Sequence, residues 1–150
     1  MLAINDISYY LKGSRILIID DCQSFQRLIS EILRKAGVTS VIVASTLEEG
    51  MQHLNYNHDC KVPVLNFDMI LMDINLPDGN GIEGCKFIAS HEATNDVPVV
   101  VISGDHTTKS IQDAFNAGAS DYLQKPVITD MLKMRLGLLL KLRVLELRCT

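Results

Sequence analysis

The sequence is poor in the residues that build disulfide frameworks, thiolate metal sites and aromatic binding surfaces. It contains no tryptophan, 5% aromatic residues, four prolines and four cysteines among 150 residues. The cysteines are Cys22, Cys60, Cys85 and Cys149. None of them forms a CxxC pair, so we interpret them as isolated thiols and expect neither a cysteine metal site nor a disulfide framework.

Signals for export or membrane insertion are also missing. The amino terminus lacks the charged start and apolar core that mark a signal peptide. The longest uncharged run in the leucine-rich tail, residues 136–140, is far too short to cross a bilayer. We therefore expect a cytoplasmic protein that does not associate with membranes.

The charge balance does not indicate a nucleic-acid-binding surface. The chain has 18 acidic and 14 basic residues, a net charge of -4. The charge is unevenly distributed, because residues 129–150 carry five bases and two acids, a local +3, which leaves -7 on the first 128 residues. We expect no direct nucleic-acid binding by this chain.

Short apolar runs alternate with amphipathic helical stretches. Apolar runs predict strands at residues 15–20, 40–44, 67–73, 97–102 and 120–123. Helical spacing and capping signals predict helices at residues 22–36, from 46, at 82–90, at 107–117 and from 129. An unusually long connector occupies residues 58–66, and 14 residues precede the first strand.

This alternation predicts an α/β fold. Five strands that alternate with five helices favour a doubly wound, five-stranded parallel sheet joined by right-handed crossovers. We divide the chain into an N-terminal extension (1–14), a core (15–128) and a long C-terminal helix (129–150). In such sheets, ligands bind at the carboxyl ends of the strands.

Five polar residues stand at that edge. Asp20 and Asp21 stand at the carboxyl end of the first strand and Asp73 at that of the third, whereas Ser103 follows the fourth strand and Lys125 follows the fifth. Like charges about 4 Å apart repel by roughly 4 kcal/mol at an effective dielectric of about 20, so three converging acids need a cation or raised pKa values. Lys125 neutralises only one charge, and an all-oxygen donor set suits Mg²⁺.

Two further aspartates in the segment FDMILMDINLPDGNG (67–81) are expected to have no part in this chemistry. Asp68 begins the third strand, so it belongs at the opposite edge of the sheet, in solvent. Asp78 lies in a Pro/Gly turn, where aspartate commonly bonds the local backbone.

The converging groups are the components of phosphoryl transfer. A carboxylate can serve as the covalent nucleophile. A divalent ion, an ammonium group and a hydroxyl can then stabilise the equatorial oxygens of the transferred group.

Four segments make the chain resemble a response regulator receiver domain, the phosphoacceptor module of two-component signalling. They are ILIIDD (16–21), DMILMDINLPDGNG (68–81), VVVISG (99–104) and AGASDYLQKP (117–126). The resemblance covers about residues 15–140 and implies a flavodoxin-like sheet in the order 2-1-3-4-5. It implies a switch, not a metabolic enzyme: Asp73 accepts phosphate from a histidine kinase or phosphotransfer protein, with Mg²⁺, and the changed conformation controls an unknown output domain or partner.

The resemblance also implies a role for each matched position. The Mg²⁺ ligands would be Asp20, mostly through water, Asp21, Asp73 and the backbone carbonyl of Asn75. Ser103 would hydrogen-bond the phosphoryl group, and Lys125 would pair with it.

Further positions match the switching and timing elements of the family. Tyr122 matches an aromatic switch, whose ring turns inward on phosphorylation and remodels the face of the fourth helix, fifth strand and fifth helix. Lys125–Pro126 is expected to be a cis peptide. Asn75 and Asp105, each two residues past a matched site residue, resemble positions that tune phosphate loss.

Three alternative functions fit the sequence less well. A receiver-like interaction module that works without phosphorylation is the main alternative, although the complete set of site residues argues against it. An aspartate-nucleophile phosphatase needs a second acid two residues past the nucleophile, where this chain has Asn75. A flavin-binding protein would carry a Ser/Thr-rich phosphate loop in place of DDCQSFQ (20–26).

The C-terminal helix has two apolar stripes. One contains Met131, Leu138, Leu142 and Leu145, and the other contains Leu132, Leu136, Leu140, Val144 and Leu147. Packing on one sheet face uses one stripe. The other stripe is expected either to form a homodimer or to continue as a coiled-coil linker to an output domain; a widely buried helix is the alternative.

Overall fold

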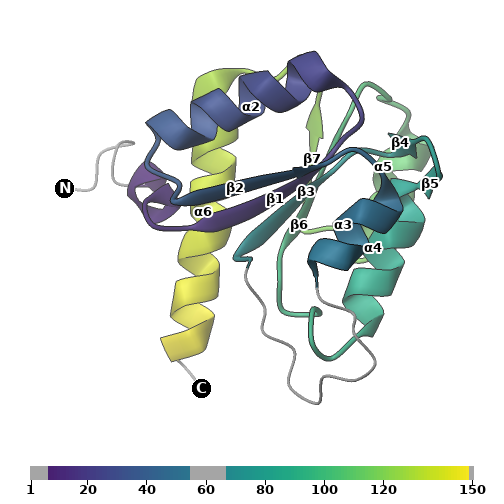
Figure 1. The fold of residues 1–150 in the computed structure, drawn as a ribbon. Coiled ribbons are helices and arrows are strands. Elements are labelled where there is room, and N and C mark those ends of the chain that lie inside the picture. Colours follow the sequence, from purple (N-terminus) through teal and green to yellow (C-terminus); the bar gives the residue numbers. More distant parts are fainter. Residues whose placement is uncertain (1–6, 55–66, 149–150) are drawn as a thin grey trace.

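A five-stranded parallel sheet lies between two layers of helices in the computed structural model, which describes residues 7–54 and 67–148 (Figure 1). Its strands are β1 (Arg15–Ile19), β2 (Ser40–Ala44), β3 (Met69–Met72), β6 (Val99–Ser103) and β7 (Asp121–Gln124). They are ordered β2-β1-β3-β6-β7. Counted within this sheet alone, that is the predicted order 2-1-3-4-5, and the doubly wound fold is confirmed.

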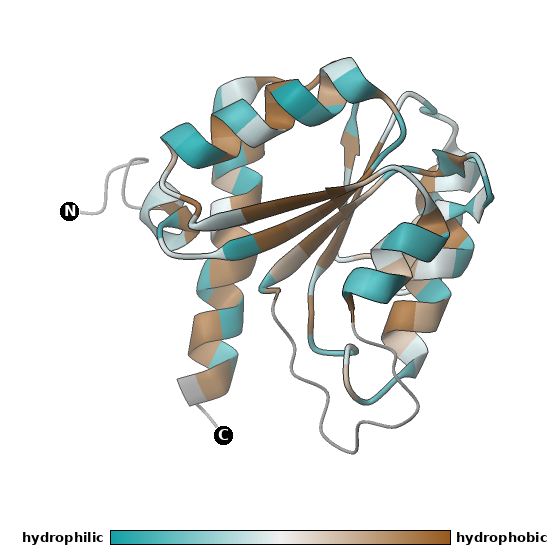
Figure 2. Cartoon of the chain, in the orientation of Figure 1, coloured by the Kyte–Doolittle hydropathy of each residue, from teal (hydrophilic) through white to brown (hydrophobic). Residues whose placement is uncertain are grey.

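The helices are α2 (Gln23–Lys35), α3 (Leu47–His53), α4 (Gly81–Ser90), α5 (Thr108–Asn116) and α6 (Thr129–Arg148), with a short 3-10 helix η1 (Tyr9–Leu11) before the sheet. One face of the sheet is covered by α2, α6 and η1, and the other by α3, α4 and α5 (Figure 1). Alternate side chains of β1 serve the two cores: Ile16 and Ile18 pack with α2 and α6, whereas Leu17 and Ile19 pack on the opposite face. The inner residues of the strands are accordingly apolar (Figure 2), whereas β7, DYLQ, begins and ends with a polar residue.

The segment between β3 and α4 is more structured than the turn predicted for it. Residues Asn75–Leu76 (β4) and Gly79–Asn80 (β5) pair as a small antiparallel hairpin. β3 and β6 each begin two residues later than the predicted strands at 67 and 97. The connector at 58–66 lies outside the described residues.

The two stripes predicted for the C-terminal helix separate as expected. Leu132, Leu136 and Leu140 are at most 4% exposed and belong to the core, whereas the four residues of the other stripe, Met131, Leu138, Leu142 and Leu145, are 40–53% exposed. Leu147 departs from its stripe at 65% exposed, because the last turns of α6 project past the sheet (Figure 1). Neither α6 nor any other helix in the described ranges is long and apolar enough to span a membrane.

The N-terminal segment packs against α6. Leu11 is fully buried in the core shared by α2 and α6. A Cβ at Gly137 would lie 2.5 Å from the carbonyl oxygen of Ile7, so the glycine permits this close backbone approach in mid-helix. The division of the chain at residue 14 stays a prediction.

Candidate functional site

Three carboxylates converge at the carboxyl edge of the sheet. β1 and β3 are neighbours with Ile19 opposite Met72, so the residues that follow them, Asp20, Asp21 and Asp73, come together. One oxygen from each of these aspartates lies within 4.8 Å of the others. Asp20 and Asp73 are nearly buried, at 2% and 8% exposed, whereas Asp21 is exposed at the mouth of the site.

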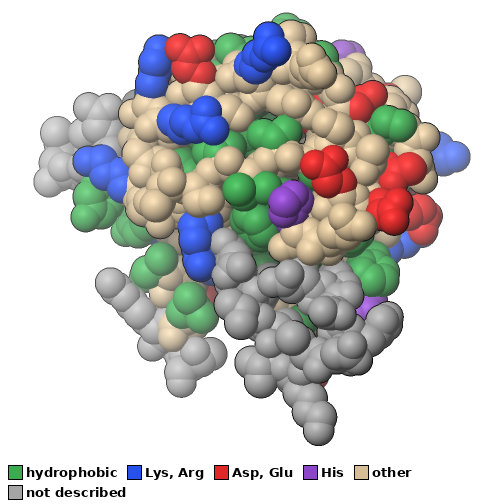
Figure 3. Space-filling view, in the orientation of Figure 1, with side chains coloured by type: hydrophobic (Ala, Val, Ile, Leu, Met, Phe, Trp, Pro, Cys, Tyr) green, Lys and Arg blue, Asp and Glu red, His purple; other side chains and the backbone are tan. Residues whose placement is uncertain are grey.

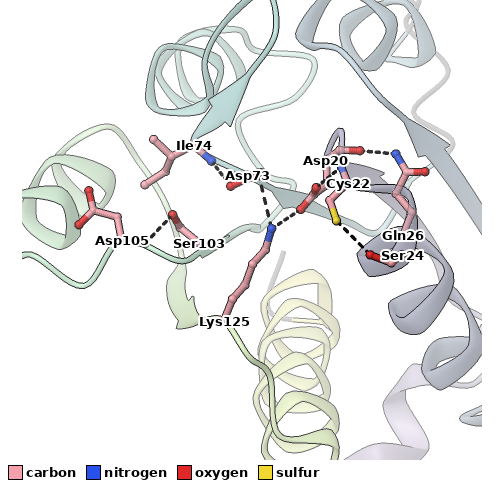
Figure 4. A network of polar contacts seen from close by, with 9 residues as sticks. All are labelled: Asp20, Cys22, Ser24, Gln26, Asp73, Ile74, Ser103, Asp105 and Lys125. Atoms are coloured by element: carbon pink, nitrogen blue, oxygen red, sulfur yellow. Dashed lines mark hydrogen bonds and ion pairs between the residues drawn. The ribbon is translucent and has the colours of Figure 1, made fainter.

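Asp20 is fixed by the chain around it. Its Oδ1 accepts a hydrogen bond from the backbone N–H of Cys22 at 2.8 Å, and its Oδ2 accepts one from Lys125 Nζ at 2.7 Å (Figure 4). The Gln26 side-chain amide donates to the backbone carbonyl of Asp20 and to Ser45 Oγ. α2 therefore holds the acidic loop that precedes it.

The Asp73 carboxylate is nearly buried and lies beside a second acid, Asp20. Its Oδ1 accepts from the backbone N–H of Ile74 at 2.8 Å, and its Oδ2 lies 3.6 Å from Lys125 Nζ. Burial is the main cause that raises the pKa of Asp73, and the nearby Asp20 carboxylate adds to it, while Lys125 and the backbone donors oppose it. A cation bound among the three acids would relieve this charge.

Lys125 reaches the acids from the end of β7. The Lys125–Pro126 peptide is cis, as predicted. The ammonium lies 4.1 Å from the centre of the Phe25 ring, close enough for a cation–π contact. Lys125 thus contacts two carboxylates and one aromatic ring, and it lies nearer to Asp20 than to Asp73.

Ser103 and Tyr122 occupy neighbouring strands beside the site. Ser103 is fully buried, and its Oγ accepts from the backbone N–H of Asp105 at 3.2 Å (Figure 4). The Tyr122 side chain is directed inward: the residue is 9% exposed, and its hydroxyl donates to the backbone carbonyl of Asp105. Burial raises the pKa of the Tyr122 hydroxyl. The loop after β6 therefore connects the serine and the tyrosine.

The carboxylate of Asp105 is bound to the start of α5. It accepts from Thr107 N at 2.9 Å and from Ser110 Oγ at 2.6 Å, and the bond from Ser110 is the main cause that lowers the pKa of Asp105. Asn75 is exposed in β4, two residues past Asp73.

Asp68 and Asp78 lie outside the acidic cluster, but both make more contacts than expected. Asp68 stands at the opposite edge of the sheet, where its Oδ2 accepts from the backbone N–H of Arg15 at 2.9 Å; it is therefore not simply solvated. Asp78 accepts from Leu47 N and Glu48 N at 2.8 and 2.9 Å, so it caps α3, a role that the turn prediction did not include. These bonds lower the pKa of Asp78. The hairpin β4–β5 carries it to α3.

Sequence reasoning missed two residues of the site. Phe25 has the helical spacing of a core-facing residue and packs against the core, a pattern that gives no sign of the contact between its ring and Lys125. Gln26 carries no sequence signal, because its partners Asp20 and Ser45 meet it only through the packing of α2 on β1 and β2.

The donor set fits a hard divalent cation. The acidic cluster is made only of oxygen donors, and one of its members is open to solvent. Lys125 supplies a single positive charge to the three acids. Carboxylates with room for water and phosphate oxygens match the preference of Mg²⁺.

Comparison with known proteins identifies the family. The family model described as "Response regulator receiver domain" matches residues 16–136. Chemotaxis protein CheY1 of Helicobacter pylori is 27% identical over 126 residues, which cover 84% of this chain and 96% of that protein. The CAI-1 autoinducer sensor kinase/phosphatase CqsS of Vibrio cholerae is 30% identical over 120 residues, 79% of this chain but 16% of that protein.

Solved structures agree with this match. A CheY-like response regulator receiver domain protein from Methanospirillum hungatei superposes with a TM-score of 0.76 at 27% identity, covering 89% of this chain and 98% of that chain. A two-component response regulator from Clostridium difficile superposes with a TM-score of 0.73 at 29% identity, covering 85% and 96%. This chain belongs to the response regulator receiver domain family, the phosphoacceptor domains of signalling proteins.

Proposed function

We propose that Asp73 is the phosphoacceptor of this receiver domain. The observation that carries the proposal is the near-burial of the Asp73 carboxylate beside two other acids and Lys125. An Asp73 carboxylate oxygen would attack phosphorus and form an acyl phosphate as the bond to the donor breaks and the donor leaves with the bonding electrons. The comparisons give no support to the alternative, an interaction module that works without phosphorylation.

The metal proposed for this site is Mg²⁺, held by Asp20, Asp21, Asp73 and the backbone carbonyl of Asn75. When bound, it would supply positive charge to the acids and to the phosphoryl oxygens. Lys125 would then leave Asp20 and pair with the phosphoryl group. The cation–π contact with the Phe25 ring would stabilise the ammonium during that exchange.

Ser103 and Tyr122 are proposed to convert phosphorylation of Asp73 into a conformational change at the protein surface. The Ser103 hydroxyl, once bound to a phosphoryl oxygen, would draw the loop after β6 toward Asp73. The Tyr122 hydroxyl is hydrogen-bonded to the same loop, so the ring would move when the loop moves. The carboxylate of Asp105 would influence phosphate loss only after releasing α5, whereas Asn75 is exposed and would act without such a change.

The partners proposed are a histidine kinase or phosphotransfer protein as donor, an effector or output domain as receiver of the signal, and a second copy of the chain bound through α6. A cytoplasmic location suits these partners. Such partners are general to receiver domains, and the family match supports them.

The proposed function is tested by incubating the chain with a small acyl phosphate and Mg²⁺. Intact mass spectrometry is expected to show one added phosphoryl group, which is absent with a chelator in place of Mg²⁺. Borohydride reduction of the acyl phosphate followed by peptide mapping would place it at Asp73. No adduct, or an adduct on another residue, would overturn the assignment.

Lys125→Gln is expected to slow adduct formation about 100-fold, because a preorganised charge on the transferred group is lost. The same change is expected to tighten Mg²⁺ binding, since the ammonium 2.7 Å from Asp20 Oδ2 competes for that carboxylate. Intact mass over time measures the rate, and calorimetric titration measures Mg²⁺ affinity. Lys86→Gln on the exposed side of α4 is the matched control, expected to change neither. An unchanged transfer rate in Lys125→Gln would contradict this role.

A further inference from the structure

The exposed face of α6 carries large side chains at a regular spacing. They are Ile128, Met131, Arg135, Leu138, Leu142 and Leu145, hereafter the seam. Their separations alternate between three and four residues, which is the heptad spacing of paired helices. The five apolar members are 40–66% exposed. Ile128 already belongs to the helical turn, because its carbonyl accepts from Leu132 N at 2.9 Å.

The seam stands on a helix that the domain has already formed. Leu132, Leu136 and Leu140 anchor α6 in the core, so the seam points to a different side of the same helix. Isolated pairs of short helices must also offset the entropy of helix formation. Here that cost is met by the domain core, and a seam of this length is sufficient for a weak association. Hydrophobic side chains are visible along the free end of α6 (Figure 3).

We propose that the seam binds the seam of a second copy of this chain, with the two α6 helices parallel. The proposal rests on the self-association proposed above and adds its surface, orientation and register. In a parallel pair, a residue that flanks the seam on one side contacts the residue five positions later on the other copy. Lys141 and Glu146 flank the seam at that separation. Two-fold symmetry would form this Lys–Glu contact twice.

An antiparallel pair lacks this complementarity. It brings together flanking positions from the same side of each helix, so Lys141 would lie on the side of Lys141 of the other copy. The charge pattern therefore favours the parallel arrangement.

Arg135 is the one charged residue of the seam, and it is already paired with Asp121 at the start of β7. Its Nε donates to Asp121 Oδ2 at 2.8 Å and its Nη2 donates to Asp121 Oδ1 at 3.3 Å. The carboxylate reduces the repulsion between the two arginines of a parallel pair. A polar residue at a single seam position lowers stability but favours one register and one number of strands.

The amino end of the seam borders a cavity of about 360 Å³ between β7 and α6. Ile128, Met131 and Arg135 line it together with Tyr122 and Lys125. A second copy on the seam would therefore border the cavity that Lys125 of the acidic site also lines. Five apolar side chains per copy make an interface at the small end of stable ones, so a dissociation constant of about 10–100 μM is expected.

Sedimentation velocity on the full chain tests whether the seam forms the dimer. The protein concentration runs from about 1 to 500 μM, a range set by the expected affinity. We expect a reversible monomer–dimer equilibrium that Leu142→Glu weakens at least tenfold. Leu147→Glu is the matched control on the same helix: Leu147 is 65% exposed but off the seam, so its dimerisation should match that of the unmodified chain. A monomer throughout the range, as would follow if α6 binds a different protein, would overturn the proposal. Equal weakening by both variants would overturn it too.

Charge exchange tests the orientation. Lys141→Glu and Glu146→Lys are each expected to weaken the dimer about three- to tenfold, and the double variant Lys141→Glu/Glu146→Lys to restore it. Weakening by both single changes without restoration would overturn the parallel arrangement. Leu142→Glu should still form the phosphoryl adduct on Asp73. Absence of the dimer can therefore be distinguished from absence of phosphorylation on Asp73, because intact mass measures the adduct on the same samples.

Discussion

Asp73→Asn is expected to abolish the phosphoryl adduct and, in metal-free buffer at neutral pH, to stabilise the folded domain by about 1 kcal/mol, since it removes a nearly buried charge from beside two other acids. The adduct is lost because an amide is not a nucleophile for this transfer. The stability rises because a nearly buried carboxylate beside Asp20 is replaced by a neutral group of the same shape, which can still accept from Ile74 N. Intact mass and urea denaturation measure the two effects.

The gain in stability should depend on pH in a defined direction. The pKa of Asp73 is raised in the folded state, so its charged form destabilises folding at pH values above that raised pKa. As pH falls through the raised pKa toward the ordinary value of 3.8, Asp73 takes up a proton and the advantage of Asp73→Asn disappears. Added Mg²⁺ should also reduce the advantage, because the proposed ion would bind the folded wild-type site and stabilise it.

Asp68→Asn is the matched control for Asp73→Asn, since it changes the aspartate at the other end of the same strand. It loses an ion pair with Arg15 and should keep the phosphoryl adduct without any gain in stability. A less stable Asp73→Asn in metal-free buffer at neutral pH would contradict the raised pKa of Asp73. A persistent adduct would contradict its role as acceptor.

Gly81→Ala is expected to destabilise the domain by about 3 kcal/mol or more and to reduce adduct formation severely. A Cβ at this position would overlap the carbonyl oxygen of Asp73 and lie 2.8 Å from its carbonyl carbon. Gly81 N also donates to the Ile74 carbonyl at 2.7 Å, so α4 begins in direct contact with the loop that follows Asp73, the proposed acceptor. Backbone atoms cannot move aside as the end of a flexible side chain can. The loop that follows Asp73 or the start of α4 must therefore shift.

Gly104→Ala is the control for that prediction. Gly104 follows Ser103, and a Cβ there would meet nothing within 4 Å, so a change in stability of about 0.5 kcal/mol or less is expected. Urea denaturation and the rate of adduct formation are measured for both variants. If Gly81→Ala unfolds at the same urea concentration as Gly104→Ala, the close contact between α4 and the acceptor loop is wrong.

Much of the fold was predictable because its signals are local. The apolar run at 15–19 and the helical spacing after it each identify an element without reference to the rest of the chain. The rule that parallel strands present their carboxyl ends at one edge then predicted that Asp20, Asp21 and Asp73 meet, and they do. The two stripes of α6 were separable for the same reason, since they depend only on helical spacing.

What lay beyond prediction depends on contacts between distant segments. Asp78 caps α3, about 30 residues earlier, because the hairpin β4–β5 carries it there, and a turn motif alone does not indicate that helix. Leu147 follows the spacing of the buried stripe, yet it is exposed because α6 extends past the sheet. Burial at the end of a helix depends on what the helix packs against.

The sequence by itself determined the alternation of strands and helices, the family, and the set of acids, hydroxyl and lysine at the strand ends, because each follows from periodicity or position within one element. Only the tertiary structure decided how these groups divide their contacts. It placed Lys125 closer to Asp20 than to Asp73 and against the Phe25 ring, and it brought Gly81 onto the carbonyl of Asp73. These distances depend on how the helices pack on the sheet, which no single segment encodes.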